Sequence, residues 1–152
     1  MHCGFAIVHA MTEASETWRP LVLIVDDSPT HVAFARQCLE TAGYRVSVAA
    51  TGRQALQLTR EIGPDLLLMD VVMPDMNGYQ ATRKLSRSKV TAHIPIILAS
   101  SKDQESDRVW GMRQGAVDYL VKPLEEAKLL ARVRYALDRA AASEAKAPGA
   151  ND

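Results

Sequence analysis

The sequence predicts an α/β fold in which a five-stranded parallel sheet carries helices on both faces. Short, continuous apolar runs alternate along the chain with segments whose apolar residues follow the helical period, which is the pattern of β–α units. The apolar runs are continuous, so the strands are expected to be buried on both sides, as in parallel sheets. The chain has 152 residues, of which 47% are hydrophobic and 24% charged, values typical of a globular protein.

The first β–α unit is predicted from a strand and a helix start that follow one another closely. Leu21–Val25 is a continuous apolar run of strand length. Asp27 or Ser28 caps the following helix, because either side chain accepts a hydrogen bond from a main-chain N–H group, and Pro29 suits the first helical position. Gly43 is expected to end this helix, since glycine readily adopts the left-handed conformation of a C-terminal cap.

The second unit and the third strand follow the same pattern. Arg45–Ala49 is predicted as a strand, and Thr51–Ile62 as a helix whose apolar residues Ala55, Leu58 and Ile62 face inward. Gly63 and the proline after it stop that helix. Leu66–Met69 is a third short apolar run, and it ends in Asp70, a residue type that favours turns.

The second half of the chain supplies two further strands and three further helices. Tyr79–Ser86 is predicted as a helix after a loop that contains proline and glycine. Ile94–Ala99 and Ala116–Val121 are the fourth and fifth strands, with the helix Asp103–Gln114 between them. Leu124–Ala140 is the last helix, because its apolar residues recur three or four positions apart.

One domain is predicted, from residue 20 to residue 139. Residues 1–19 are interpreted as a flexible N-terminal arm and residues 140–152, which are rich in alanine, as a frayed helix end with a flexible tail. No linker divides the folded part, and no output domain is expected after it.

Charge and cysteine content exclude several classes of partner. Lysine plus arginine and aspartate plus glutamate number 18 each, so the formal net charge is zero and no overall field attracts nucleic acid or an anionic membrane. No apolar stretch is long enough for membrane insertion. Cys3 and Cys38 form no metal-binding or redox pair, which is consistent with free thiols in a reducing cytoplasm.

Polar side chains gather where the predicted strands end. Asp26 and Asp27 follow the first strand, Asp70 ends the third, Ser100 follows the fourth and Lys122 follows the fifth. In parallel sheets, ligands bind beyond the carboxyl ends of the strands. Each residue alone is commonplace in a solvated loop, but their joint placement predicts a functional site at this edge of the sheet.

The residue types at this edge predict phosphoryl chemistry with magnesium. Clustered carboxylates repel one another unless a cation lies among them, and Mg²⁺ prefers such hard oxygen ligands. No histidine or cysteine of these strand-end segments recruits zinc. Lys122 and Ser100 are able to bind phosphate oxygens, and Asp70 is the best candidate for a nucleophile that forms an aspartyl phosphate. Glycine-rich nucleotide-binding motifs are absent from the sequence.

Three motifs together resemble the CheY-like receiver domain of two-component response regulators. They are Val-Asp-Asp-Ser at 25–28, Leu-Met-Asp-Val-Val-Met-Pro-Asp-Met-Asn-Gly at 68–78 and Tyr-Leu-Val-Lys-Pro at 119–123. The resemblance covers residues 20–139. It implies a flavodoxin-like, doubly wound sheet with strand order 2-1-3-4-5 and five helices.

The resemblance also implies a phosphoacceptor and a metal site. Asp70 would be phosphorylated by a histidine kinase. Asp26, Asp27, Asp70 and the main-chain carbonyl of Val72 would bind Mg²⁺. Val72 itself is apolar where some chemotaxis receivers carry a polar residue that orients water, so the phosphate lifetime is left open.

Three further residues would form the switch in such a receiver. Lys122 would contact the phosphoryl group, and Ser100 would move toward it. Tyr119 would be the aromatic residue that swings inward when Ser100 moves. A cis peptide bond before Pro123 is usual in the family.

The segment Ser101–Ala116 is similar to the corresponding segment of PilH-type regulators of the type IV pilus chemotaxis-like system, which control twitching motility. A downstream protein is therefore expected to bind at residues 103–121. Two modes of action remain open: signalling through this contact, or draining phosphate from a shared kinase. A monomer and a phosphorylation-dependent dimer are both compatible with the sequence.

Two rival functions have less support from the residues. A Mg²⁺-dependent phosphohydrolase would place its nucleophile on the first strand with a second acid two residues later, whereas Asp26 and Asp27 are adjacent. A pseudo-receiver would lack part of the acidic site. The protein is therefore not expected to be an enzyme beyond its own phosphorylation and dephosphorylation. His31 and His93 are interpreted as surface residues without a catalytic partner.

Overall fold

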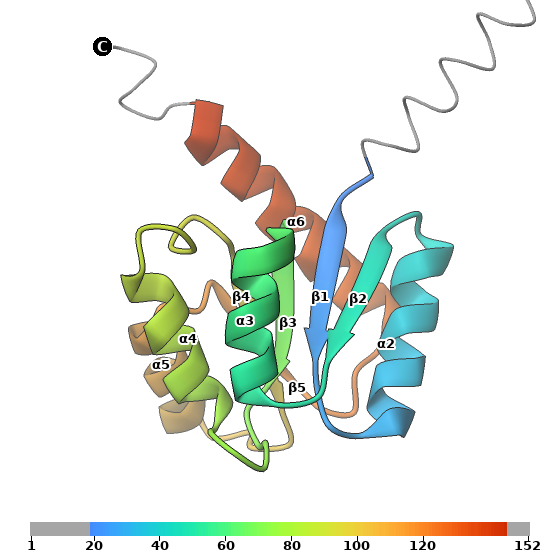
Figure 1. Ribbon diagram of the computed structural model, residues 1–152. Helices are drawn as coiled ribbons and strands as arrows, with labels where there is room; N and C mark the ends of the chain where they lie inside the picture. The colour runs from blue at the N-terminus through green and yellow to red at the C-terminus, as the bar shows by residue number, and fades with distance from the viewer. Residues whose placement is uncertain (1–18, 146–152) are drawn as a thin grey trace, which may run out of the picture.

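In the computed structural model, which describes residues 19–145, five strands alternate with five helices (Figure 1). The strands are β1 (Leu21–Val25), β2 (Arg45–Ala49), β3 (Leu66–Asp70), β4 (Ile96–Ser100) and β5 (Asp118–Val121). The helices are α2 (Pro29–Thr41), α3 (Gly52–Ile62), α4 (Gly78–Arg87), α5 (Glu105–Gln114) and α6 (Glu126–Ala145). The predicted alternation of strands and helices is confirmed.

All five strands are parallel and follow the order β2-β1-β3-β4-β5, as the family resemblance predicted. From β1 the chain adds β2 on one side, and it then returns to add β3, β4 and β5 on the other side. Strands β1 and β3 are therefore neighbours in the middle of the sheet. Val22, for example, pairs with Val46 on one side and with Leu66 on the other. The loops that follow β1 and β3 therefore emerge side by side at the topological switch point of the sheet.

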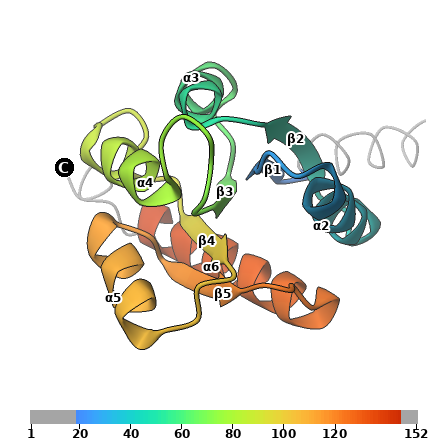
Figure 2. The same cartoon turned by 90° about the horizontal axis from the view of Figure 1, so that it is seen from below.

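Helices cover the sheet in two layers. Helices α3, α4 and α5 lie on one face and α2 and α6 on the other, as Figures 1 and 2 both show. Alternate side chains of the strands point to opposite faces, so the sheet separates two hydrophobic clusters. Leu23, Val25 and Met69 belong to the first, with Tyr79 and Leu85 of α4. The second contains these buried residues: Val22, Ile24, Leu39, Leu68, Leu129 and Val133.

Local signals in the sequence fix the helix starts. The Ser28 hydroxyl caps α2 by accepting a hydrogen bond from the His31 N–H, which decides between the two predicted caps. Thr51 caps α3 in the same way. At α4, Asn77 and Gln80 form a reciprocal capping box.

Several element boundaries differ from the sequence prediction, among them the starts of β4, α5, β5 and α6 and the end of α6. Strand β4 begins at Ile96 instead of residue 94, because Pro95 has no N–H to contribute to the ladder. Helix α6 continues to Ala145, so part of the predicted tail is helical; alanine has the highest helix propensity, which explains the extension. The predicted arm at residues 1–18 and the tail at 146–152 lie outside the described residues.

The described chain enters and leaves the fold at the same edge of the sheet. The first residue of β1 and the last turn of α6 both lie where the strands begin (Figure 1). The carboxyl ends of the strands lie at the opposite edge, onto which Figure 2 looks.

A carboxylate from a distant loop joins the start of α3 to the loop after β3. The Asp75 carboxylate accepts hydrogen bonds from the N–H groups of Gly52, at 2.8 Å, and Arg53, at 2.9 Å. These bonds, the one from Arg53 foremost, lower the pKa of Asp75 below its ordinary value. Negative charge is favourable at a helix N-terminus, so ionised Asp75 stabilises both segments.

Replacing Asp75 by alanine is expected to lower the urea midpoint of unfolding at pH 7. A carboxyl group with a lowered pKa stabilises the fold above its ordinary pKa of about 3.9, and this contribution is lost as the pH falls through the folded-state pKa. The difference in unfolding free energy between wild type and Asp75→Ala should therefore shrink in acid. Urea titrations at several pH values measure this difference in unfolding free energy. Asp103→Ala, which removes an exposed carboxylate, is the control. A wild-type to Asp75→Ala difference that does not change with pH would contradict the proposed charge effect.

Candidate functional site

Three carboxylates meet at the carboxyl ends of β1 and β3. Asp26 and Asp27 follow β1, and Asp70 is the last residue of β3. One oxygen from each carboxylate lies within 4.8 Å of the others. Asp26 and Asp70 are almost buried, whereas Asp27 is exposed. The sheet thus brings together the three acidic residues that the sequence predicted for this edge.

Lys122 joins two of these carboxylates from the end of β5. Its ammonium nitrogen Nζ lies 2.9 Å from Asp26 Oδ2 and 3.1 Å from Asp70 Oδ1. The Lys122 side chain is only 10% exposed, so solvent screens these ion pairs weakly. The peptide bond between Lys122 and Pro123 is cis, as expected from the family resemblance.

Burial is the main influence on the charge of Asp70. It raises the pKa of Asp70 above its ordinary value, and the negative charge of Asp26 acts in the same direction. Lys122 and the main-chain N–H of Val72 oppose this rise. The carboxylate therefore lies in a setting where its negative charge is only partly compensated, and a further cation would stabilise it.

The arrangement fits a hard divalent cation. Asp26, Asp27 and Asp70 offer carboxylate oxygens, and the loop after β3 brings Val72 to the same open cleft of about 670 Å³. Mg²⁺ takes one or two carboxylates together with water and phosphate oxygens, so a site open on one side suits it. No cysteine lines this cleft. One histidine lines it, His31, and its Nδ1 atom lies 3.0 Å from Lys122 Nζ.

Ser100 and Tyr119 contact the same main-chain residue. The buried Ser100 hydroxyl accepts a hydrogen bond from the Lys102 N–H at 3.1 Å, and the Tyr119 hydroxyl donates one to the Lys102 carbonyl at 2.9 Å. Ser100 lines the acidic cleft, whereas Tyr119 does not. Lys102 thus links Ser100 to Tyr119. The residue types in the sequence did not indicate this link, because the main chain of Lys102 makes both contacts.

The rings of two tyrosines pack together behind this link. Burial, and next the hydrogen-bonding and charge influence of Tyr119, raise the pKa of Tyr79 well above its ordinary value. The Tyr79 hydroxyl donates to the Asp107 carbonyl at 3.3 Å, and both rings lie beside Gly111 of α5. The Tyr79 hydroxyl stays protonated at neutral pH and ties α4 to α5, while the Tyr119 hydroxyl ties β5 to the segment before α5.

His31 is a site residue that the sequence analysis assigned to the surface. Its side chain is 52% exposed, but its Nδ1 lies 3.0 Å from Lys122 Nζ and 3.6 Å from Asp26 Oδ2. Its place on the first turn of the helix that follows the acidic pair is the one sequence feature that indicates proximity to the site.

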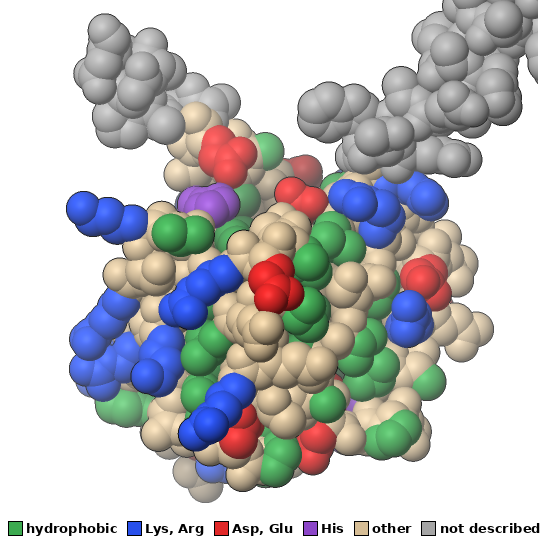
Figure 3. All heavy atoms as spheres, in the orientation of Figure 1, with side chains coloured by type: hydrophobic (Ala, Val, Ile, Leu, Met, Phe, Trp, Pro, Cys, Tyr) green, Lys and Arg blue, Asp and Glu red, His purple; other side chains and the backbone are tan. Residues whose placement is uncertain are grey.

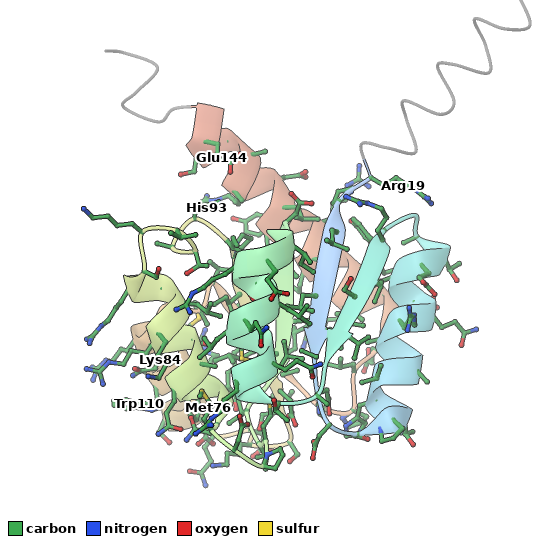
Figure 4. The ribbon with its side chains drawn as sticks, viewed as in Figure 1. Arg19, Met76, Lys84, His93, Trp110 and Glu144 are labelled. Carbon is green, nitrogen blue, oxygen red and sulfur yellow. The ribbon has the colours of Figure 1, made fainter. Side chains whose placement is uncertain are left out.

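The segment predicted to bind a partner carries an exposed apolar surface. Trp110 of α5 is 50% exposed and points away from the sheet (Figure 4). Half of the exposed large hydrophobic side chains among the described residues lie within 103–121: Val109, Trp110, Met112, Val117 and Val121.

The fold and the acidic cluster agree with a known protein family. The family model of the response regulator receiver domain matches residues 22–134. The chain belongs to the response regulator receiver family. A receiver of this kind is a module of two-component signalling and is typically not an enzyme in its own right.

Individual relatives support the same assignment. Protein PilH of Pseudomonas aeruginosa is 48% identical over 116 residues, which cover 76% of this chain and 96% of PilH. A response regulator structure from Chloroflexus aurantiacus is 35% identical with a TM-score of 0.77, covering 79% of this receiver and 98% of the other chain. The receiver is thus PilH-like in sequence, and CheY-like receivers are among its structural neighbours.

A third relative carries a metal ion. The receiver domain of a sensor histidine kinase from P. aeruginosa was solved with magnesium in its active-site cleft. It is 30% identical, with a TM-score of 0.73, and the match covers 79% of this chain and 98% of that one. Receiver domains bind Mg²⁺ at an acidic site, and the cluster of three aspartates occurs in this receiver too. No helix among the described residues combines the length and apolar character needed to cross a membrane.

Proposed function

We propose that Asp70 accepts a phosphoryl group from the phosphohistidine of a histidine kinase. The supporting observation is its position: Asp70 ends the central strand, inside a cluster formed by Asp26, Asp27 and Lys122. An Asp70 carboxylate oxygen forms a bond to phosphorus while the phosphorus–nitrogen bond to the kinase histidine breaks. The electron pair of that bond stays on the imidazole nitrogen, and the aspartyl phosphate is the covalent product.

The residues around Asp70 have separate roles in this step. Asp26, Asp27, Asp70 and the Val72 carbonyl would hold Mg²⁺, which offsets negative charge on the phosphoryl oxygens when bound. Lys122 is placed to donate a hydrogen bond to a phosphoryl oxygen, since its ammonium already reaches the Asp70 carboxylate.

Ser100 and Tyr119 are proposed to carry the signal away from the site. A phosphoryl group on Asp70 would offer an anionic acceptor for the Ser100 hydroxyl proton, whereas in the present contact that hydroxyl only accepts a hydrogen bond from the Lys102 N–H. Movement of Ser100 would disturb the Lys102 main chain, to which the Tyr119 hydroxyl is bonded. The Tyr119 ring, which is already buried beside α5, would then change its position, and the surface at 103–121 would change shape.

This surface is the proposed contact for a downstream protein. Trp110 is a residue type that often anchors protein interfaces, and it is half-exposed in the helix that Tyr119 contacts. Figure 3 shows lysine and arginine side chains gathered over α4. The likeness to PilH supports a place in cytoplasmic type IV pilus signalling, as a partner-binding regulator or a phosphate sink, with a monomer or a phosphorylation-dependent dimer as the acting form.

Acetyl phosphate, a small phosphodonor, tests the proposed chemistry. In the presence of Mg²⁺ the intact mass of the purified protein should increase by one phosphoryl group, and chelation with EDTA should prevent the increase. Asp27→Asn removes one proposed metal ligand from an exposed position, so it should raise the Mg²⁺ concentration needed by about tenfold or more.

Asp103→Asn is the matched control, because it removes an exposed carboxylate from outside the acidic cluster. It should behave as the wild type. Phosphorylation that persists without Mg²⁺ would contradict the metal site. No mass increase from either acetyl phosphate or phosphoramidate, with Mg²⁺ binding shown separately, would contradict the proposed phosphoryl transfer.

A further inference from the structure

The ammonium group of Lys122 has a complete set of hydrogen-bond acceptors. An ammonium carries three protons, and three acceptor atoms surround this one: Asp26 Oδ2 at 2.9 Å, Asp70 Oδ1 at 3.1 Å and His31 Nδ1 at 3.0 Å. Two of the acceptors are the carboxylates of the proposed phosphorylation site. The third, His31, has no place in the receiver chemistry described so far.

The third contact requires a particular form of the histidine ring. A protonated Nδ1 would direct an N–H group at the ammonium across 3.0 Å, so two donors would face each other. The contact is favourable when Nδ1 carries a lone pair and the proton is on Nε2. In that tautomer, His31 accepts the third proton of Lys122.

The surroundings of Lys122 give this ring a distinct role. Between α2 and the start of α6 lies a cavity of about 270 Å³, walled by Phe34, Leu124 and other apolar side chains. Apart from the two carboxylates, its polar lining includes Thr30 and His31, and the His31 ring is the one in contact with the ammonium. On the cavity side, His31 is the group that orients Lys122.

We propose that His31 is a positioning residue for Lys122, a role that rests on the proposed phosphorylation of Asp70. By holding one proton of the ammonium, His31 fixes the directions of the other two toward the carboxylates and thus toward an incoming phosphoryl group. Without this acceptor the Lys122 ammonium loses one of its three hydrogen bonds. Phosphoryl transfer to Asp70 then slows, even though the phosphodonor still binds.

Nitrogen NMR tests the contact independently of any phosphorylation. In ¹⁵N-labelled wild type above the pH range in which imidazoles titrate, His31 should show a protonated Nε2 and a hydrogen-bonded, unprotonated Nδ1. Its signals are assigned by their loss in His31→Asn. In Lys122→Met the Nδ1 signal should move to the position of a solvated nitrogen. A protonated Nδ1 in the wild type, or an Nδ1 signal unchanged by Lys122→Met, would overturn the proposal.

Two substitutions at position 31 test the consequence for phosphoryl transfer. His31→Phe keeps a ring without an acceptor, whereas His31→Asn places an oxygen where Nδ1 lies. Rates are measured over a range of acetyl phosphate concentrations with saturating Mg²⁺. His31→Phe should lower the maximal rate by about 3- to 10-fold, the worth of one such hydrogen bond, and leave the half-saturating concentration unchanged. His31→Asn should restore most of the rate.

His93→Phe serves as the control, since His93 lies at the edge of the fold away from the cleft (Figure 4). Equal rates for His31→Phe and wild type, or equal losses in His31→Phe and His31→Asn, would overturn the positioning role while leaving the phosphorylation of Asp70 intact. A wild-type protein that acquires no phosphoryl group would instead overturn the proposed function itself.

Discussion

Asp70→Asn is expected to abolish phosphoryl incorporation while the fold persists. The asparagine amide has nearly the same shape and keeps an oxygen for the Lys122 hydrogen bond, but it lacks the carboxylate that forms the bond to phosphorus. Intact mass after incubation with Mg²⁺ and acetyl phosphate measures the loss. Retained incorporation of one phosphoryl group would show that another residue is the acceptor.

The same substitution has a predicted effect on stability. Burial raises the pKa of Asp70, so ionising this group costs more in the folded chain than in the unfolded one. This cost appears as the pH rises from the ordinary aspartate pKa, about 3.9, through the raised folded value. In EDTA at neutral pH, Asp70→Asn should therefore unfold at a higher urea concentration than wild type, and the gain should vanish in acid. A lower urea midpoint for Asp70→Asn than for wild type at neutral pH would show that the attraction between Asp70 and Lys122 outweighs the cost of burying the Asp70 charge.

Gly78→Ala is expected to destabilise the fold and to impair phosphorylation together. A Cβ atom at position 78 would collide with the main-chain carbonyl oxygen of Asp70 and lie 2.9 Å from the Val71 Cα. The Gly78 N–H also donates to the Val71 carbonyl at 2.7 Å, which holds α4 against this loop. Main chain cannot move aside as a flexible side chain does, so the loss in unfolding free energy should be about 1–3 kcal/mol.

Gly52→Ala is the matched control for this prediction. A Cβ there would meet the Cγ and sulfur atoms of the Met76 side chain, which has several rotamers available. Urea unfolding and acetyl phosphate labelling of both variants should show a much smaller effect for Gly52→Ala. Equal stability of Gly78→Ala and Gly52→Ala would contradict the view that close main-chain packing at Gly78 shapes the phosphorylation site.

The sequence was sufficient to predict the architecture and the acidic cluster, because both depend on order along the chain. Continuous apolar runs separated by helices specify a parallel sheet, and parallel strands place the residues that follow them at one edge. The positions of Asp26, Asp70 and Lys122 followed from this rule alone. The strand order 2-1-3-4-5, by contrast, came from the family resemblance, since short β–α units are compatible with several orders.

Contacts that depend on three-dimensional proximity were beyond the sequence. His31 and Lys122 are 91 positions apart, and nothing in the spacing of either residue indicates that the ring reaches the ammonium. The Lys102 main chain joins Ser100 to Tyr119 through groups that every residue possesses, so no residue type marks it. The prediction that Ile62 faces inward was wrong: the helical period places it on the inner face, but it is the last residue of α3 and is exposed.

The placement of the chain ends has a practical consequence for experiments. Strand β1 begins and α6 ends at the edge opposite the acidic cleft (Figure 1). A biosensor chip or a fluorescent label attached next to the start of β1 or the end of α6 would therefore leave the cleft facing the solution. Kinase, metal and partner binding can all be measured on one immobilised preparation, with Trp110 available as an internal optical reporter on a different face.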